Sequence, residues 1–178
     1  MALTKIDEKI RSGATSINFD TDIDSTYKVY KFVFLEMNPA ASGSGVYFSF
    51  QGGAGSYATI MTTTFWKSAH YEDGASGEGG DMGLAQHQES GYQKLFQGPG
   101  PGATESIAGE LYLFNPSSTT FVKHFICVTT GIYGPYADRG VTNTQVAGYF
   151  NVTTAITSIG FKMLDDSAFD ATIQMWGL

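Results

Sequence analysis

The chain has 178 residues and a mass of 19.1 kDa, which is the size of one domain with room for a sizeable core. Ten Lys and Arg against 17 Asp and Glu give a net charge of −7, which argues against nucleic acid or an anionic membrane as a partner. The single cysteine, Cys127, excludes an internal disulfide and any metal site built from several cysteines. No apolar stretch has the length of a membrane span or the form of a signal peptide. We therefore expect a soluble single-domain protein.

The first fourteen residues differ from the rest of the chain in charge, because they carry three basic and two acidic residues on an otherwise acidic protein. Leu3, Ile6 and Ile10 precede Gly13 at a spacing that could form two turns of helix, although so short a helix is marginal in water. We interpret residues 1–14 as an N-terminal arm that is disordered in isolation, and residues 15–178 as one β-sandwich domain. The three apolar side chains are candidates for contact with a partner.

Short segments of alternating apolar residues, separated by Gly, Pro, Asn, Asp and Ser, occupy most of the chain after the arm. The clearest places Tyr30, Phe32 and Phe34 on one face of a strand. Its other face is also largely apolar, so this strand is predicted to be central. The same alternation marks residues 46–50, where Ser49 is expected to face outward, and residues 119–128.

Two further segments, residues 158–164 and 172–176, are predicted to form a closing hairpin. No stretch carries the apolar stripe of a long helix. The pattern predicts an all-β fold of two antiparallel sheets packed as a jelly-roll-like sandwich. The residues expected in its core are Phe32, Phe34, Phe48, Phe125, Phe161 and Ile173.

Residues 68–91 contain five carboxylates and six glycines without Lys or Arg, which predicts a long solvated loop that includes Asp73. Asp20, Asp22 and Asp24 alternate as in a calcium loop, but the turn glycine and the bidentate glutamate are missing, so a turn is expected.

The residues that catalysis or metal binding would need are not grouped in the sequence. The three histidines lack metal-ligand spacing, and no nucleophile, phosphate-binding or dinucleotide motif occurs. His124 lies on a predicted strand and is expected to be buried and hydrogen-bonded, and Cys127 is expected to be an inert core thiol. The sequence thus favours a protein without enzymatic activity, cofactor or metal.

Aromatic residues near predicted loops could stack on sugar rings while neighbouring carboxylates and amides bind the hydroxyls. By position alone, these candidates are Trp66, Tyr71, Tyr133, Tyr136 and Trp176. Asp73 and Arg139, in the loops beside them, are candidate polar contacts.

Three separated blocks resemble one known family: Ile23 to Tyr27, Gly109 to Ser118, and Ile156 to Phe161 followed by Ala171 to Gly177. The family is a β-sandwich module of bacteriophage virion proteins, found in tail fibres and related surface proteins of marine and cyanobacterial phages. Ala171 and Trp176 stand where the family usually has Gly and Tyr. The resemblance implies a structural role in the virion, made in the host cytoplasm, and it carries no catalytic residues.

Two functions are compatible with this resemblance. The first is a capsid decoration or cement protein that binds the major capsid protein as a symmetric oligomer, with a homotrimer expected, through the arm and an apolar sheet edge. The second is a tail-fibre or tail-tip module in which the loops at 68–91 and 133–139 contact a host surface glycan. Copy number on the particle separates them.

Overall fold

The computed structural model describes residues 3–41, 43, 45–72, 74, 76–80, 82–133 and 140–178, and for residues 76–80 and 82 it describes the backbone alone. These residues include one short 3₁₀ helix, η1 (Met82–Leu84). The strands, in chain order, are β1 (Thr4–Ala14), β2 (Ile17–Phe19), β3 (Val29–Pro39), β4 (Tyr47–Gly53), β5 (Met61–Tyr71), β6 (Ser76–Gly80), β7 (His87–Glu89), β8 (Gln93–Gln97), β9 (Ile107–Phe114), β10 (Lys123–Tyr133), β11 (Gly140–Phe150), β12 (Ser158–Met163) and β13 (Phe169–Gly177).

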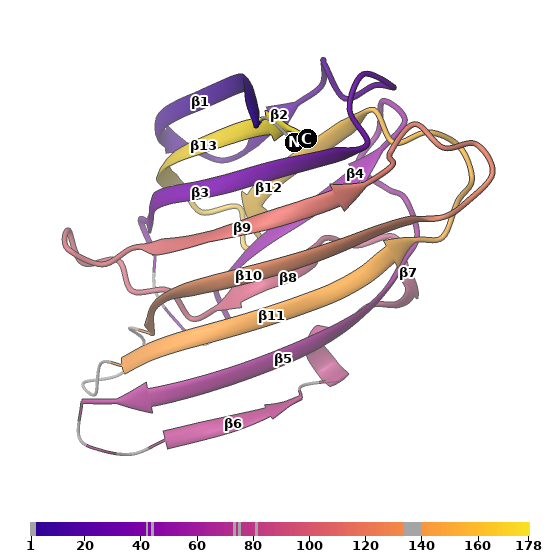
Figure 1. Ribbon diagram of the computed structural model, residues 1–178. Coiled ribbons are helices and arrows are strands. Elements are labelled where there is room, and N and C mark those ends of the chain that lie inside the picture. The colour runs from indigo at the N-terminus through magenta and orange to yellow at the C-terminus, as the bar shows by residue number, and fades with distance from the viewer. Residues whose placement is uncertain are drawn as a thin grey trace.

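The strands form two antiparallel sheets that pack as a sandwich (Figure 1). The large sheet has the order β1-β13-β3-β9-β10-β11-β5-β6, with β7 also paired to β5, and the small sheet has the order β2-β12-β4-β8. Eight strands remain when β5, β6, β7, β10 and β11 are set aside. If these eight are renumbered from 1 to 8 along the chain, their order is 1-8-3-6 in the large sheet and 2-7-4-5 in the small sheet. This interleaving is the jelly-roll order. The predicted all-β, jelly-roll-like sandwich is confirmed.

Two insertions widen the large sheet. One adds β5, β6 and β7 between β4 and β8, and the other adds β10 and β11 between β9 and β12. Both extend the large sheet beyond β9, and Figure 1 shows β11, β5 and β6 side by side toward its lower edge. The small sheet reaches this extension through β8, which lies against β10 and β11.

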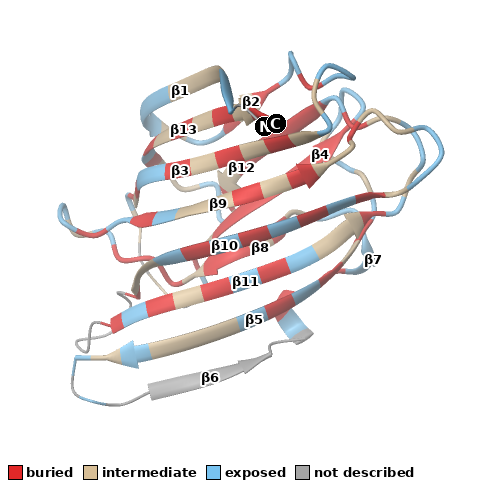
Figure 2. Cartoon of the chain, in the orientation of Figure 1, coloured by how far each residue is buried: buried red, intermediate tan, exposed pale blue. Residues whose placement is uncertain are grey.

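The core is a cluster of aromatic rings between the sheets. All six residues predicted for it are at most 1% exposed, so that prediction is confirmed. The ring of Phe161 is central, because its centroid lies within 6.4 Å of five other phenylalanine rings, three from β2 and β3 and two from β4. The predicted position of β3 is also confirmed, since it lies between β13 and β9 with Tyr30, Phe32 and Phe34 fully buried (Figure 2).

The N-terminal segment differs from the predicted arm or helix. Residues 4–14 form β1, which pairs antiparallel with β13 from Thr4 opposite Gly177 to Ala14 opposite Phe169. The half-buried Ile6 packs against the core, whereas Leu3 and Ile10 are 46% and 65% exposed. The sequence did not reveal this strand because β1 is an edge strand with two register shifts, so its side chains do not alternate cleanly.

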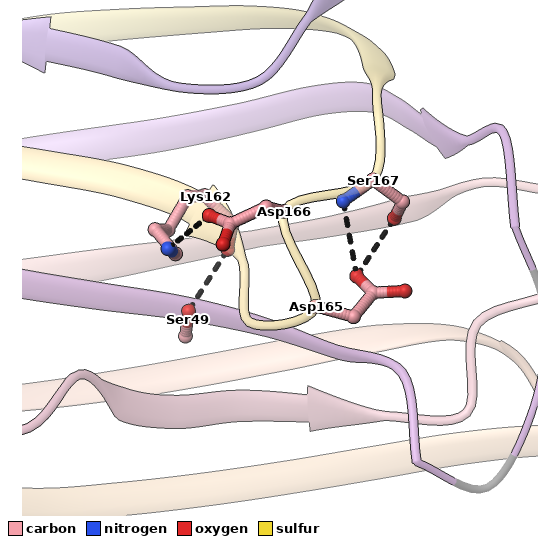
Figure 3. A network of polar contacts seen from close by, with 5 residues as sticks. All are labelled: Ser49, Lys162, Asp165, Asp166 and Ser167. Carbon is pink, nitrogen blue, oxygen red and sulfur yellow. Dashed lines mark hydrogen bonds and ion pairs between the residues drawn. The ribbon is translucent and has the colours of Figure 1, made fainter.

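The predicted closing hairpin is wrong. β12 pairs with β2 and β4 in the small sheet, whereas β13 pairs with β1 and β3 in the large sheet. The connection therefore crosses between the sheets, and a polar network holds it in place (Figure 3). In this network Lys162 forms an ion pair with Asp166, and both the backbone N–H and the hydroxyl of Ser167 donate to Asp165. In a jelly roll, consecutive strands often lie in opposite sheets, so adjacency in sequence does not imply pairing.

Residues 68–91 are not one long loop, as the sequence predicted. β5 continues to Tyr71, β6 pairs back on it from Ser76 to Gly80, and β7 pairs with the beginning of β5. Backbone hydrogen bonds pair these strands, and the glycine-rich sequence gives no side-chain alternation from which to predict them. Asp73 lies outside the described residues.

Candidate functional site

The outer face of the added strands β10, β11 and β5 is a broad surface with exposed apolar side chains. Alternate residues of β10 point to opposite sides of the sheet, so Phe125 and Cys127 are buried in the sandwich while Ile126 and Val128 face outward, 45% and 41% exposed. We call the outward side of these three strands the β10–β11–β5 face. Trp66 on β5 belongs to it and is 48% exposed.

The strand register groups the side chains of this face into rows. Val128 on β10 lies opposite Gln145 on β11, which lies opposite Trp66 on β5. The next row is Ile126, Ala147 and Thr64. Side chains directly opposite each other on neighbouring antiparallel strands are in contact range. The rows therefore place Trp66, Val128 and Ile126 around the small side chain of Ala147.

Ala147 lies at the floor of a depression in this face. Two open hollows, of about 280 and 320 Å³, share Thr64, Ile126 and Ala147 in their linings. One hollow extends to Trp66 and Val128, and the other extends along the strands toward the next row. A small residue among larger ones leaves a recess that a side chain from outside can fill.

The β10–β11–β5 face carries no formal charge from Asp, Glu, Lys or Arg. All of its outward positions on the three strands are described, and they hold apolar, hydroxyl, amide, tyrosine and histidine side chains. Charged residues begin on the strands at either side. Glu110 of β9 forms an ion pair of 2.6 Å with Lys31 of β3, and Glu78 of β6 is the register partner of Ser68 on β5. The Glu110 carboxylate raises the pKa of Lys31, which also lies 5.1 Å from the ring centre of Tyr112. The Lys31–Glu110 pair is neutral and bounds the uncharged area on the β9 side.

The outer face of the small sheet is covered by the protein's own loops. Ser49, expected to face outward, is fully buried there, and its hydroxyl donates to the Lys162 carbonyl at 2.9 Å. Gln51 beside it is also buried, and its amide donates to the carbonyls of Ser90 and Gly91 at 2.9 and 2.8 Å. The protein therefore covers one outer face and leaves the apolar side chains of the β10–β11–β5 face exposed.

The structure disperses the candidate contact residues. Trp66 is on the β10–β11–β5 face, but Tyr133 is buried and packs against the half-buried Tyr71, with 6.1 Å between the ring centres. Tyr133, expected to be available for stacking, is buried, whereas Tyr71 keeps part of its surface exposed. Tyr136 and Arg139 lie outside the described residues.

The remaining candidates lie at the opposite end of the large sheet. Leu3, Ile6 and Ile10 belong to or precede β1, the edge strand farthest from Trp66 in the sheet order. Trp176 is half-buried on β13, where its indole N–H donates to Gln174 at 3.2 Å. The predicted contact residues that the structure describes do not form one site.

Sequence reasoning missed Ile126, Val128, Gln145 and Ala147. The alternation of β10 did separate Ile126 and Val128 from Phe125 and Cys127, but both sets are apolar. The order of the strands decides which set meets the small sheet, and alternation does not encode that order. His124, expected to be buried, is exposed on the outer side, with its ring centre 5.8 Å from that of Tyr149.

The described residues do not bring nucleophilic or metal-binding groups together. Burial raises the pKa of the Cys127 thiol, so the thiol stays protonated inside the sandwich. The described part of the chain contains no cluster of three or more His, Cys, Asp and Glu side chains that could hold a metal ion.

Asp24 serves the turn before β3. It accepts hydrogen bonds from the backbone N–H of Thr26 and the hydroxyl of Tyr30, at 2.8 and 3.0 Å, and these bonds lower its pKa. This is the turn chemistry that the sequence predicted.

Comparison with known proteins gives no match to a family model, to a curated protein or to a solved structure. Within the described residues, no helix is long and apolar enough to cross a membrane.

Proposed function

We propose that this chain is a non-enzymatic structural protein of a bacteriophage virion, bound to the outer surface of the capsid. The observation that carries the proposal is the uncharged, partly apolar β10–β11–β5 face on a protein whose net charge is −7. Neighbouring exposed apolar side chains, bordered by polar ones, are typical of a surface that contacts another protein. If the protein is attached to a capsid, the neighbouring proteins of the particle surface can cover this face.

The blocks that resemble the phage module support this assignment, because they meet at one corner of the fold. Tyr27 from the first block packs its ring against Gly177 from the last, and Asn115 from the middle block donates its backbone N–H to the carbonyl of Lys28 at 2.6 Å. The backbone N–H of Ile156 donates to the carbonyl of Pro116 at 2.9 Å. The resemblance thus lies in residues that build the jelly roll, which fits kinship in fold rather than in a catalytic site.

The chemistry of the hollows on the β10–β11–β5 face favours binding over catalysis. Their linings contain His124 but no carboxylate, and the thiol of Cys127 is buried beneath them. General acid–base chemistry needs a proton donor and acceptor placed on either side of a reacting group. These hollows instead provide a recessed apolar surface that a side chain of a partner can fill.

Quantified protein bands from purified particles test the proposal. A decoration protein is present in a copy number comparable to that of the major capsid protein, and antibodies against this chain label the outside of intact capsids. Absence from purified particles, or a position inside the capsid, would overturn it.

A tail-fibre or tail-tip module that binds a host glycan is the alternative, and Trp66 is the observation that favours it. The exposed indole is flanked by Gln145 and Thr64, so a flat ring adjoins neutral hydrogen-bonding groups. Sugar rings bind to such combinations. In that case the copy number would match tail proteins, and Trp66→Ala would reduce adsorption of the particle to its host.

A further inference from the structure

We infer that a second copy of this chain covers the β10–β11–β5 face, with the same face of each copy packed against the other. The inference rests on the proposed function and names one partner of its exposed surface. Four observations carry it: the exposed apolar side chains, the absence of charge, the shape around Ala147 and the size of the face.

Charge selects the partner. Two copies of a protein with a net charge of −7 repel each other wherever their acidic surfaces meet. The outward positions of β10, β11 and β5 carry no Asp, Glu, Lys or Arg. At the borders, the Lys31–Glu110 pair beside β10 is neutral, and Glu78 beside Ser68 lies on the outermost strand β6. Face-to-face contact there keeps the charged surfaces apart and removes Ile126, Val128 and Trp66 from water. A basic partner would instead be expected to meet an acidic surface.

The shape of the face suits contact with itself. Trp66 borders the hollow that has Ala147 at its floor, so a large ring and a recess lie side by side on one patch. A two-fold contact joins the same patch on both subunits, and it requires that each bulge meet the partner's recess. With the two-fold axis between Trp66 and Ala147, each indole fills the other copy's hollow. Such a contact forms a closed dimer, whereas a trimer is expected from the sequence.

The size of the face reaches what a specific pair needs. Strands β10, β11 and β5 cover about 14 Å at the usual spacing of neighbouring strands, and a strand of 11 residues is about 36 Å long. The face therefore offers about 500 Å² per copy, so a pair buries about 1,000 Å² in total, which is the lower limit for a specific interface. Sheets packed face to face also form the sandwich itself, so this contact repeats a geometry the fold already uses.

Sedimentation equilibrium of the purified full chain tests the inference, with two matched variants. Ile126→Lys places a charge in the centre of the face, and Ile10→Lys makes the same change on β1, where the isoleucine is 65% exposed. We expect the wild type and Ile10→Lys to form dimers at micromolar concentration, and Ile126→Lys to associate at least about tenfold more weakly. Melting curves of both variants establish that they fold.

Ala147→Tyr is a second test, because it fills the recess without adding charge, at an exposed position. It should weaken dimer formation as Ile126→Lys does, and it decides the matter if Ile126→Lys fails to fold. Association should also shift the tryptophan emission of the wild type to shorter wavelength, and Trp66→Phe should lose most of that shift.

Several outcomes overturn the inference. The inference is wrong if the wild type is monomeric throughout the micromolar range. It is also wrong if Ile10→Lys and Ile126→Lys weaken dimer formation equally. A monomer that binds a glycan through Trp66, or that pairs only with another virion protein, assigns the face to that partner instead. Copy number on the particle is measured separately, so a monomeric decoration protein would refute this inference while leaving the proposed function intact.

Discussion

The ring of Tyr27 lies directly on the backbone of Gly177. A Cβ atom built on Gly177 would stand 2.4 Å from Cγ of that ring, and the ring itself is held by edge-to-face packing on Tyr30, with 5.8 Å between the centroids. Because Cγ is the inner end of the side chain, the ring cannot turn away without leaving Tyr30. This contact joins the turn before β3 to the end of β13.

Gly177→Ala should therefore destabilise the fold. We expect the free energy of unfolding to fall by about 1 to 3 kcal/mol, as in other overpacked sites. Gly45→Ala is the matched control, since Gly45 is exposed and a Cβ there meets nothing within 4 Å. Denaturant unfolding of the two variants measures the difference. Equal stability of both would show that Tyr27 moves aside at little cost.

Phe161→Ala should be among the most damaging single substitutions in the core. Its ring contacts five other phenylalanine rings from both sheets, so truncation leaves a cavity that the rigid strands cannot close. The expected loss is about 3 to 5 kcal/mol. Phe121→Ala removes the same atoms at a position that is 69% exposed and should change stability by less than about 0.5 kcal/mol. Similar losses at the two positions would contradict the packing described.

These two phenylalanines also show what the sequence can and cannot predict. Phe161 alternates with Ile159 and Met163 along β12, and all three are buried; the burial of Phe161 confirms its prediction. Phe121 is as apolar as Phe161, but it lies outside the strands, and nothing in the local pattern distinguishes it. The buried face of a strand can thus be predicted where large apolar residues alternate along it, because only the interior of the sandwich removes so many aromatic rings from water.

The features that could not be predicted depend on which strands become neighbours. β1 becomes a strand because β13 offers it a free edge, and its own mixed sequence does not require that conformation. The β10–β11–β5 face exists because two insertions, far apart in the chain, add to the same edge beyond β9. Trp66 and Val128 are thereby placed in one row although 62 residues separate them in the numbering. Periodicity within a segment carries no information about such rows.

Lys123 is fully buried at the beginning of β10. Its ammonium donates a hydrogen bond of 3.0 Å to the carbonyl of Val152, and among the described residues it forms no ion pair with a carboxylate. Desolvation lowers its pKa below the ordinary value of 10.5. The unfolded chain therefore binds more protons than the folded chain between the lowered pKa and 10.5, and the free energy of unfolding rises with pH in that window.

Lys123→Met should stabilise the protein at neutral pH by about 1 kcal/mol, because it keeps the volume of the side chain and removes the buried charge. The advantage of the variant should shrink as the pH rises toward 10.5, where the unfolded lysine also loses its proton. Lys28→Met, at an exposed lysine, is the control and should leave both stability and its pH dependence unchanged. Denaturant unfolding from pH 7 to pH 10 measures these differences. A destabilised Lys123→Met would mean that the bond to Val152 outweighs the cost of burying the charge.

Deletion of residues 1–14 tests the role of β1 in the sandwich. β1 pairs with β13 along most of its length, and Ile6 packs against the core, so its removal exposes one edge of β13 and part of the apolar surface beneath. We expect the thermal midpoint to fall by more than about 10 °C, which for a domain of this size corresponds to a loss of several kcal/mol. Thermal unfolding followed by circular dichroism measures the shift, and Ile10→Ser serves as the control because it leaves the strand in place. A deletion variant that melts within a few degrees of the wild type would contradict this expectation. It would show that β1 contributes little to stability, as a mobile arm would, because the six strands from β13 to β5 would then stabilise the large sheet without it.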